Sequence, residues 1–435
     1  AFAVGADEAS TTLRVPVVCD GVAPSLVLEP VARTTTEATI TIRCQVDESA
    51  VVAVLDQSRS LSPNATEAFE VPLRPWRNRL EVRATDAAGN VGRAVVEVFR
   101  EAPLTLAPKD SWPALDEAGA GPRKLILKPG THVVSALIKG EVSIRAAAPG
   151  VVLESIPDKD VFELRGGVLR LEGLSIRARG LRERPVPEWQ ETVDSPTGLR
   201  IYEGEATVTS CTFESEGGDG ISLAGERSRV TVDKCRFQDV HWTGVYVEQD
   251  ATAQIRESRF ERTNVGVWAH HRGSAELTGC MTSDHRQHGV FAQERGRLTL
   301  NDVTVKRATG TAFLAFGNAH LEAVKLRAED SGCGLNVSKR SIGKIRDLTV
   351  KATKNNAVVV AGARVTLTGA RIEQAGLTGV FLHTLASLKA KDLTVSGAKA
   401  FGIGLKKRSN LIANNVTVEG KQPEQQSVWT QLLIA

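Results

Sequence analysis

The sequence is poor in several residue types, and each shortage narrows the classes of protein that it can encode. Its 435 residues include one Met, two Tyr and 5% aromatic residues in all. No stretch approaches the ~18 to 20 apolar residues that a membrane-spanning helix needs, and no signal-peptide apolar segment is present. The formal net charge of +3 is too small to favour nucleic acid as a partner. The opening Ala1-Phe2-Ala3 has the form of a remnant of Ala-x-Ala cleavage, but the edge of an expressed fragment would read the same.

Cysteine is also scarce, with six residues and no Cys-x-x-Cys pair, so we expect no structural zinc site. Cys19 and Cys44 are candidates for a disulfide, which would agree with an oxidising compartment. The other four cysteines lie in a repeated region: Cys211, Cys235, Cys280 and Cys333. We expect the first three to be free thiols in the core, because side chains on neighbouring coils point in parallel and their Cβ atoms stay too far apart for a bond.

What the chain has is a repeat. A tetrapeptide of the form Gly-(Val/Ile)-x-(Val/Leu) starts at intervals of 22 to 24 residues. Clear copies begin at Gly220, Gly244, Gly266, Gly289, Gly379 and Gly402, and weaker copies at Thr311, Gly334 and Ala357. So steady a period indicates one structural unit stacked on itself.

A second repeated segment has apolar residues at its first, fourth and sixth positions, as in Val232-Asp233-Lys234-Cys235-Arg236-Phe237. The step from one to four does not fit a straight strand, so we expect a bend at the third position in left-handed conformation. That position holds Gly173, Ser210, Lys234, Glu257, Gly279, Asp302, Ala323, Asp347, Gly369, Asp392 and Asn415. Short strands separated by bends, each stacking on its successor, predict a parallel β-helix.

These coils, with the Pro129-Gly130-Thr131-His132 turn before them, resemble the pectate-lyase-like superfamily of right-handed parallel β-helices. The fold is expected to have ~12 to 13 coils over 124–418. The Pro- and Gly-containing stretch 103–123 is expected to be a linker, and the tail 419–435, with apolar residues at near-helical spacing, a cap over the last coil. The resemblance says little about activity, because such proteins include lyases, hydrolases, epimerases, esterases, adhesins and inert stalks.

Residues 22–102, after an N-terminal segment 1–21, show the alternation of half-buried strands in a sandwich, for example over 38–42, 50–54, 79–83 and 94–98. The turn Thr85-Asp86-Ala87-Ala88-Gly89-Asn90 resembles the late hairpin of bacterial immunoglobulin-like domains. The expected fold class is therefore all-β, an immunoglobulin-like sandwich followed by the β-helix. Because such modules are usually extracellular, we expect a secreted or cell-envelope protein.

The x position of the tetrapeptide faces outward, since its aliphatic neighbours face the core. Stacked coils then place Tyr246, Trp268, Phe291 and Phe313 in an outward aromatic strip. Two residues further on, Glu248, His270 and Gln293 could hydrogen-bond a glycan. Three interpretations remain open: stacking of sugar rings, docking of a protein partner or second copy, and cover by the N-terminal domain or by the long insertion between Arg177 and Thr197. Trp189 of that insertion could lie against the strip.

Acidic residues at the bend before this strand offer a different function. Asp239, Glu261 and Asp284 fall on successive coils, with Arg262 and Arg286 nearby. Oxygen ligands of this kind suit Ca²⁺, and in the lyase-like relatives such acids bind Ca²⁺ while an Arg or Lys abstracts a proton. A solvated turn with arginine pairing is the plainer interpretation.

Two further patterns complete the set of candidates. Gly217-Gly218-Asp219-Gly220 is similar to the Gly-Asp-Asp motif of polygalacturonase-type hydrolases, but it has a single Asp where inverting hydrolysis needs paired carboxylates, so we interpret it as a turn. Five histidines fall between 241 and 288, and the coil positions scatter them too widely to share one metal: His241, His270, His271, His285 and His288.

The sequence therefore predicts first a binding or structural protein with no cofactor, which presents the aromatic strip to a polysaccharide or an envelope protein. The alternative is a polysaccharide-active enzyme (uronate lyase, epimerase or glycoside hydrolase) that uses the acids and Arg at the bend, with Ca²⁺.

Overall fold

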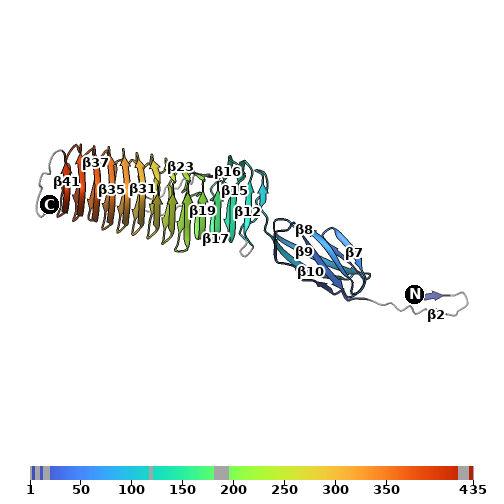
Figure 1. Ribbon diagram of the computed structural model, residues 1–435. Helices are drawn as coiled ribbons and strands as arrows, with labels where there is room; N and C mark the ends of the chain where they lie inside the picture. Colours follow the sequence, from blue (N-terminus) through green and yellow to red (C-terminus); the bar gives the residue numbers. More distant parts are fainter. Residues whose placement is uncertain are drawn as a thin grey trace. The chain divides into compact units, whose positions relative to one another are not determined.

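The computed structural model describes residues 2–4, 10–12, 20–116, 121–180, 195–419 and 431–434, which divide into two units at Pro103 and Leu104. The regular elements of these residues are all strands, as the fold class predicts (Figure 1). Within the described part of the chain, no helix could cross a membrane. Each unit is described by itself below.

The first unit holds two sheets that enclose one apolar core. A three-stranded antiparallel sheet has the order β3-β5-β8, and a five-stranded sheet the order β4-β10-β9-β6-β7. The bounds are β3 Leu26–Leu28, β4 Thr34–Thr35, β5 Thr39–Val46, β6 Ala50–Val54, β7 Gln57–Leu61, β8 Thr66–Pro72, β9 Trp76–Asp86 and β10 Val91–Arg100. Ile42, Phe69 and Val82, all fully buried, come from both sheets, so the predicted alternation corresponds to a sandwich-like core. Before them, β1 (Phe2–Val4) pairs with β2 (Ser10–Thr12).

The predicted turn joins β9 to β10. Gly89 has φ +90°, which a side chain would resist. Asn90 holds the turn by hydrogen bonds, because its backbone N–H and its side-chain amide both donate to Asp86, each at 2.8 Å. Cys44 is a buried free thiol in the core of this unit, and its predicted partner Cys19 lies outside the described residues.

The second unit is a stack of about 13 coils, which Figure 1 shows side by side. Its strands form three faces, which we name A, B and C, and within each face neighbouring strands are parallel. Face A contains β14 Ala136–Ile138, β21 Ile221–Ala224, β24 Thr243–Glu248, β27 Val265–Ala269, β30 His288–Gln293, β32 Thr311–Phe316, β34 Cys333–Ser338, β36 Val358–Ala361, β38 Val380–His383 and β40 Ile403–Leu405. Face B contains β11 Leu104–Leu106, β12 Arg123–Leu127, β15 Glu141–Ala146, β22 Ser228–Asp233, β25 Thr252–Arg256, β28 Ser274–Thr278 and β42 Gln431–Ile434. Face C contains β13 Gly130–Val133, β16 Val151–Glu154, β18 Ser175–Ala178, β20 Thr212–Ser215, β23 Arg236–Val240, β26 Arg259–Glu261 and β29 Met281–Ser283.

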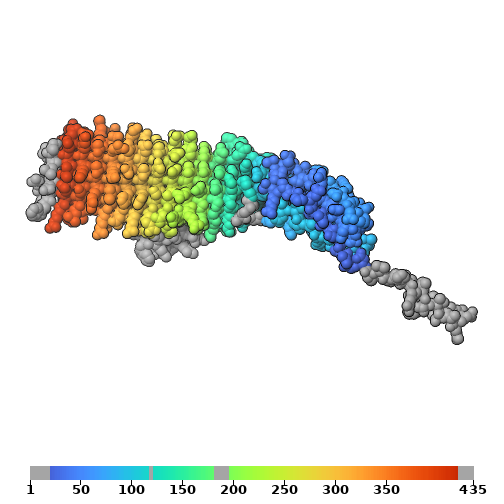
Figure 2. All heavy atoms as spheres, turned by 60° about the horizontal axis from the view of Figure 1, so that its bottom comes forward, coloured from blue at the N-terminus to red at the C-terminus, as the bar shows by residue number. Residues whose placement is uncertain are grey.

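Some strands continue from one face to the next. Faces A and B share β17 Phe162–Glu172 and β19 Leu199–Thr209; faces B and C share β31 Arg297–Lys306, β33 His320–Glu329, β35 Ile342–Lys351, β37 Arg364–Glu373, β39 Ser387–Ser396 and β41 Asn410–Val418. Figure 2 shows the coils as closely packed layers that follow one another in sequence order. In the region of the predicted cap, β42 pairs in parallel with β41 and so adds a strand to the last coil; residues 420–430 lie outside the described part.

The bend between faces B and C is left-handed, as predicted. Ser210, Lys234, Glu257 and Asp302 have φ between +46° and +52°. One predicted member is wrong: the bend in β33 is at Lys325 (φ +57°), not at Ala323. The pairing of Asn301 with Val324 and of Val303 with Leu326 places Lys325 beside Asp302, so the apolar pattern was read two residues early in that coil.

The tetrapeptide glycine is required by space rather than by backbone conformation. A Cβ added at Gly244 would lie 2.4 Å from the Phe260 ring, and one at Gly220 would lie 2.6 Å from Phe237. The side chain of the following C strand therefore packs directly over the glycine Cα. These rings also stack on one another, with Phe237 and Phe260 centroids 4.7 Å apart. Cys211, Cys235 and Cys280 are free and buried beside them, as expected.

Candidate functional site

The outward row of face A is the first part of the candidate site. Strand pairing places Ser222 beside Tyr246, Tyr246 beside Trp268, and Trp268 beside Phe291 on successive coils. Val245 and Val247 are fully buried on either side of Tyr246, so the tyrosine faces away from the core. The predicted stacking of the coils in register is confirmed at these positions.

The row is less exposed than an open aromatic strip would be. Tyr246 is 8% exposed, whereas Trp268 and Phe291 are half-buried. The rings contact in sequence: Tyr246 meets Trp268 edge-on at 5.3 Å between centroids, and Trp268 stacks on Phe291 at 5.2 Å. Among the described residues, the indole Nε1 of Trp268 is buried and has no acceptor. An unsatisfied buried donor is costly, about 1–3 kcal/mol, and a ligand oxygen that reached it would relieve that cost.

The prediction that Phe313 is the fourth member of the strip is wrong. It pairs with Val290 and is fully buried, while Leu314 takes the outward place beside Phe291. The weak copy of the tetrapeptide therefore begins at Ala312 rather than at Thr311. Alanine fits there in place of glycine because Ala328, one of the smaller residues of the C strand, follows in that coil. The run of aromatic residues on successive coils ends at Phe291.

Toward the N-terminus the same outward row becomes charged. Arg200 pairs with Ser222 in the parallel register, and Glu163 pairs with Arg200. Glu163 accepts a hydrogen bond from Arg165 at 3.1 Å. The outward positions of face A thus carry an acid and a base as well as aromatic rings, which sequence reasoning did not detect.

A second row runs along the bend that precedes face A. Asp160, Thr197, Asp219 and Thr243 occupy equivalent places on four successive coils, because the N–H of Val161 donates to Thr197 O, that of Gly198 to Asp219 O, and that of Gly220 to Thr243 O. Further along the row lie Val265, His288, Thr311, Cys333, Asn356 and Thr378.

Acceptor side chains in this row bind the threonine backbone of the next coil. Asp160 accepts from Thr197 N at 2.7 Å, and Asp219 accepts from Thr243 N at 2.9 Å. A histidine and an amide do the same later in the row, since Thr311 N donates to His288 Nδ1 and Thr378 N donates to Asn356 Oδ1, both at 3.1 Å. The structural task therefore needs an acceptor but not a charge.

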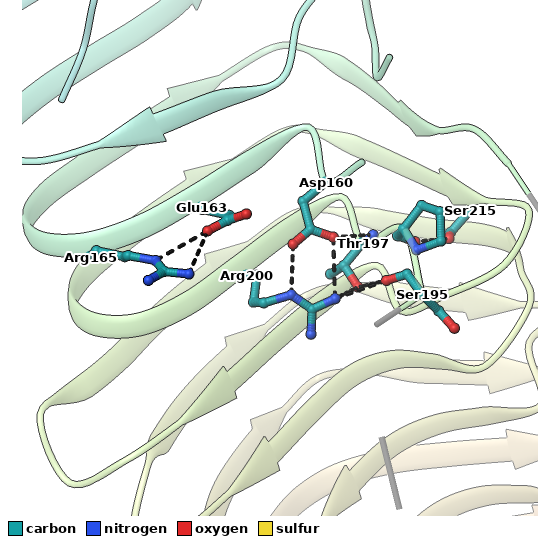
Figure 3. A network of polar contacts seen from close by, with 8 residues as sticks. Asp160, Glu163, Arg165, Ser195, Thr197, Arg200 and Ser215 are labelled. Atoms are coloured by element: carbon teal, nitrogen blue, oxygen red, sulfur yellow. Dashed lines mark hydrogen bonds and ion pairs between the residues drawn. The ribbon is translucent and has the colours of Figure 1, made fainter. Parts of the chain in front are cut away.

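Asp160 lies in a buried polar network with Arg200 (Figure 3). The Arg200 Nε donates to Asp160 at 2.6 Å, and a terminal nitrogen reaches the other carboxylate oxygen at 3.2 Å. The same guanidinium donates to Ser195 O at 2.8 Å and to Thr197 Oγ1 at 3.0 Å. The side chains of Arg200 and Asp160 are only 16% and 9% exposed, so this ion pair is largely removed from solvent.

Asp219 is the carboxyl of the row whose pKa is raised toward neutral pH. Burial raises its pKa to about 6, although the hydrogen bond from Thr243 and the positive charge of Arg200 act in the opposite direction. The negative charge of Asp160 raises the pKa further. A half-buried carboxyl that is partly protonated near neutral pH can donate a proton. The turn predicted around Asp219 therefore also places an acid beside the outward row.

The predicted acids at the earlier bend have a different arrangement. Asp239, Arg262 and Asp284 all have positive φ and follow one another on successive coils, so acid and base alternate. Arg262 donates to both oxygens of Asp239 at 2.7 Å, and Arg307 donates to both oxygens of Asp284 at 2.6 and 2.7 Å. These arginines hold the pKa of both aspartates below the usual range.

Glu261 and Arg286 complete that prediction. Glu261 lies one residue before the alternating row and accepts from Arg236 at 2.6 Å. Arg286 donates to the backbone oxygen of His241. The arginines hydrogen-bond to the carboxylate oxygens that a Ca²⁺ ion would need. The bend therefore has the ion pairs of an ordinary protein surface. The calcium and lyase interpretation of these residues remains a prediction without support from the geometry.

Glu248, His270 and Gln293 do lie side by side, at equivalent places on three coils just beyond the aromatic row. Glu248 and His270 are 9% and 1% exposed, and Gln293 is half-buried. The Tyr246 hydroxyl donates to Glu248 at 3.1 Å and lies 2.8 Å from His270 Nδ1. Trp189, which was predicted to lie against the strip, falls outside the described residues.

His285 is buried in the core and carries a pH prediction. Its Nδ1 lies 2.8 Å from Thr263 Oγ1, and burial lowers its pKa from 6.5 to about 4. Because the unfolded chain binds this proton more readily, stability contributed by the neutral ring is present above pH 6.5 and is lost as the pH falls toward 4, by on the order of 3 kcal/mol. Chemical unfolding measures how much the free energy of unfolding decreases from pH 7 to pH 4.5, and this decrease should be smaller for His285→Gln than for the parent protein. His320→Gln, which removes an exposed histidine, is the control and should behave like the parent. An equal decrease in His285→Gln and the parent would contradict the assignment.

Comparison with known proteins identifies the architecture of the second unit. Residues 197–342 match the family model described as right handed beta helix region. The catalytic unit of a thermostable α-1,3-glucanase of family GH87 from Streptomyces thermodiastaticus superimposes with a TM-score of 0.53 at 12% identity, over 92% of this chain and 90% of that one. The second unit is a right-handed parallel β-helix of the pectate-lyase-like fold.

Two further structures resemble this β-helix chain more weakly. A variant of the periplasmic alginate epimerase AlgG gives a TM-score of 0.46 at 12% identity over 80% of this chain and 85% of that one. PfbA, a surface adhesin of Streptococcus pneumoniae, gives 0.35 at 13% identity over 68% and 83%. No curated protein matches the sequence.

Asp160 and Arg200 are the residues that sequence reasoning missed, although a signal was present. Asp160-Val161-Phe162-Glu163-Leu164 aligns with Asp219-Gly220-Ile221-Ser222-Leu223. The weak tetrapeptide at 161 and the insertion after Arg177 hid that correspondence, and with it the second carboxylate that the motif around Asp219 was judged to lack.

Proposed function

We propose that the protein is an exported enzyme that hydrolyses a polysaccharide on face A of its β-helix. The observation that carries the proposal is the placement of two carboxyl groups, Asp160 and Asp219, two coils apart in the row along the bend. That row runs beside the outward row of Ser222, Tyr246 and Trp268. The enzyme alternative thereby replaces the simple binding protein as our first interpretation, with different catalytic residues from those expected at the Asp239 bend.

The spacing of the two carboxyls suits hydrolysis with inversion. Two steps of ~4.8 Å separate the Asp160 and Asp219 backbones by about 10 Å, close to the 6.5–9.5 Å that inverting glycoside hydrolases show between carboxyl groups. In this scheme protonated Asp219 donates its proton to the leaving glycosidic oxygen. The Asp160 carboxylate accepts a proton from the attacking water, and Arg200 orients it.

The aromatic row supplies a place for sugar rings beside these acids. Trp268 and Phe291 present half-buried rings, and Glu248, His270 and Gln293 offer polar atoms along the same edge. The likeness to the catalytic unit of an α-1,3-glucanase suggests α-glucans as the substrates to test first. Export is proposed because a polysaccharide substrate and an immunoglobulin-like module both favour the cell envelope or its exterior.

The direct test is a turnover assay on a panel of polysaccharides that includes α-1,3-glucan, other glucans and alginate. We expect new reducing ends from one member, and proton NMR of the first product should show inverted anomeric configuration. If no member is cleaved but one is retained by the immobilised protein, the binding interpretation is supported instead. If no member is either cleaved or retained, both interpretations are contradicted.

Trp268→Ala is expected to weaken binding of the cleaved polysaccharide by roughly tenfold or more, because it removes the central ring of the row. Phe381→Ala is the matched control, since Phe381 lies five coils beyond Trp268 in the same outward row and is likewise half-buried. Affinity electrophoresis or calorimetry with the polysaccharide measures both. Equal losses in the two variants would contradict a site at the Tyr246 to Phe291 rings.

A further inference from the structure

Three potential metal ligands converge beyond the aromatic row, and a fourth, Glu294, lies beside two of them. The ligand atoms of Glu248, His270 and His271 lie within 4.8 Å of one another. Glu294 Oε2 lies 2.6 Å from His271 Nε2 and 3.8 Å from His270 Nε2. The set therefore offers two imidazole nitrogens and two carboxylates from three successive coils.

The coil geometry explains why adjacent residues share this place. Glu248 and His270 occupy equivalent positions on neighbouring coils, and so do His271 and Glu294. Consecutive side chains of a strand point to opposite faces, but His271 has φ +39°, which ends the extended conformation. The two imidazole rings stack with centroids 3.9 Å apart and planes 24° apart.

The hydrogen bonds of Tyr246 fix the protonation of the buried ring. The tyrosine hydroxyl has one proton, and it donates that proton to Glu248. His270 Nδ1, 2.8 Å from the hydroxyl oxygen, must then be the donor of its own hydrogen bond. In the neutral ring Nε2 consequently carries the lone pair, and this nitrogen is the one nearer to Glu294. His270 Nε2 and the Glu294 carboxylate, 3.8 Å apart, can both coordinate one cation.

We propose that Glu248, His270, His271 and Glu294 bind one divalent transition-metal ion of the zinc class. Two nitrogens and two carboxylate oxygens form a tetrahedral donor set that suits Zn²⁺. Ligand atoms of a tetrahedral site with bonds of ~2.0 Å lie about 3.3 Å apart. The Glu294 carboxylate lies 2.6 Å from His271 Nε2 and 3.8 Å from His270 Nε2, on either side of that value.

Tyr246 is a positioning residue for this site. It contacts both Glu248 and His270 and sets the tautomer that directs Nε2 toward the ion. Outer hydrogen bonds of this kind typically change metal affinity by 10- to 100-fold. The inference does not rest on the proposed hydrolysis, because none of its ligands is assigned a proton-transfer role there.

The test uses the full-length chain, stripped with chelator and titrated with ZnCl₂ alone in a calorimeter, with bound zinc counted by mass spectrometry after gel filtration. We expect about one ion per chain. His271→Ala and Glu294→Gln, whose side chains are partly exposed, should lower the affinity about 100-fold or more. Tyr246→Phe should lower it about 10- to 100-fold. Binding should also weaken at acid pH, because protons compete with the ion for the ligand atoms.

The control is His320→Ala, which removes an exposed histidine on another face, and it should retain the ion. Uptake well below one ion per chain by the parent protein would overturn the proposal and indicate that a proton on His270 fills the cation's role. Unchanged uptake in both His271→Ala and Glu294→Gln would overturn it as well, by placing the ion elsewhere. Circular dichroism of each variant verifies that the coils are intact.

Discussion

Asp219→Asn is expected to lower turnover of the polysaccharide by about 10²- to 10⁴-fold, the usual contribution of a general acid, while thermal unfolding stays unchanged. The amide can still accept the Thr243 N–H, as Asn356 does natively for Thr378. It cannot donate a proton to a leaving oxygen. Because burial raises the pKa of Asp219 to about 6, activity of the parent should also decline as the pH rises through 6.

Asn356→Asp is the matched control for this prediction. It places a carboxyl in the equivalent position of the row, six coils from Asp219 and away from Arg200. We expect parental turnover. Substrate retention by Asp219→Asn should also persist, which separates loss of chemistry from loss of binding. If Asp219→Asn keeps more than about a tenth of parental turnover, Asp219 serves only the backbone hydrogen bond and the hydrolytic proposal fails.

The stacking of the coils could be predicted because it is repeated. A residue that fits one coil recurs about 22 residues later for the same physical reason. The glycine before Val245 leaves room for the Phe260 ring, and the left-handed residue at Lys234 allows the bend to face C. Each copy is weak alone, but the common period makes the register evident. The same reasoning placed Tyr246, Trp268 and Phe291 correctly in one outward row.

The prediction was wrong where the copies degrade. At 311–314 two candidates for the glycine position, Thr311 and Ala312, differ by one residue, and a one-residue shift reverses which side chains face the core. Phe313 was therefore placed outside although it is fully buried. The pairing of Val290 with Phe313 on the neighbouring coil decides the case, and that pairing is known only from the structure.

The neighbourhood of Asp160, Arg200 and Asp219 is evident only in three dimensions. Asp160 and Arg200 are 40 residues apart in sequence, and the segment between them includes the insertion after Arg177, yet the parallel register makes them neighbours. Asp219 was recognised from its motif and set aside for want of a partner carboxylate. That partner lies two coils away and is held by backbone hydrogen bonds that no local sequence pattern reports.

Arg200→Met is expected to destabilise the β-helix by about 3–5 kcal/mol, because removal of one partner leaves Asp160 as a buried charge without its counter-ion. The methionine retains most of the aliphatic volume, so the loss reports mainly the four hydrogen bonds of the guanidinium to Asp160, Ser195 and Thr197 (Figure 3). Chemical unfolding followed by circular dichroism measures it. Asp160→Asn combined with Arg200→Met should recover much of the loss, since the uncompensated charge is gone.

Arg170→Met provides the comparison, because Arg170 pairs with Glu141 at 2.6 Å but both side chains are about half exposed. Water screens that pair, so its loss should cost about 0–1 kcal/mol. The contrast between the two arginines tests whether burial, rather than the presence of an ion pair, makes the Asp160 network stabilising. An Arg200→Met variant no less stable than Arg170→Met would show that the network contributes little to the fold. Asp160 would then be retained for the reaction proposed at face A rather than for the stability of the coils.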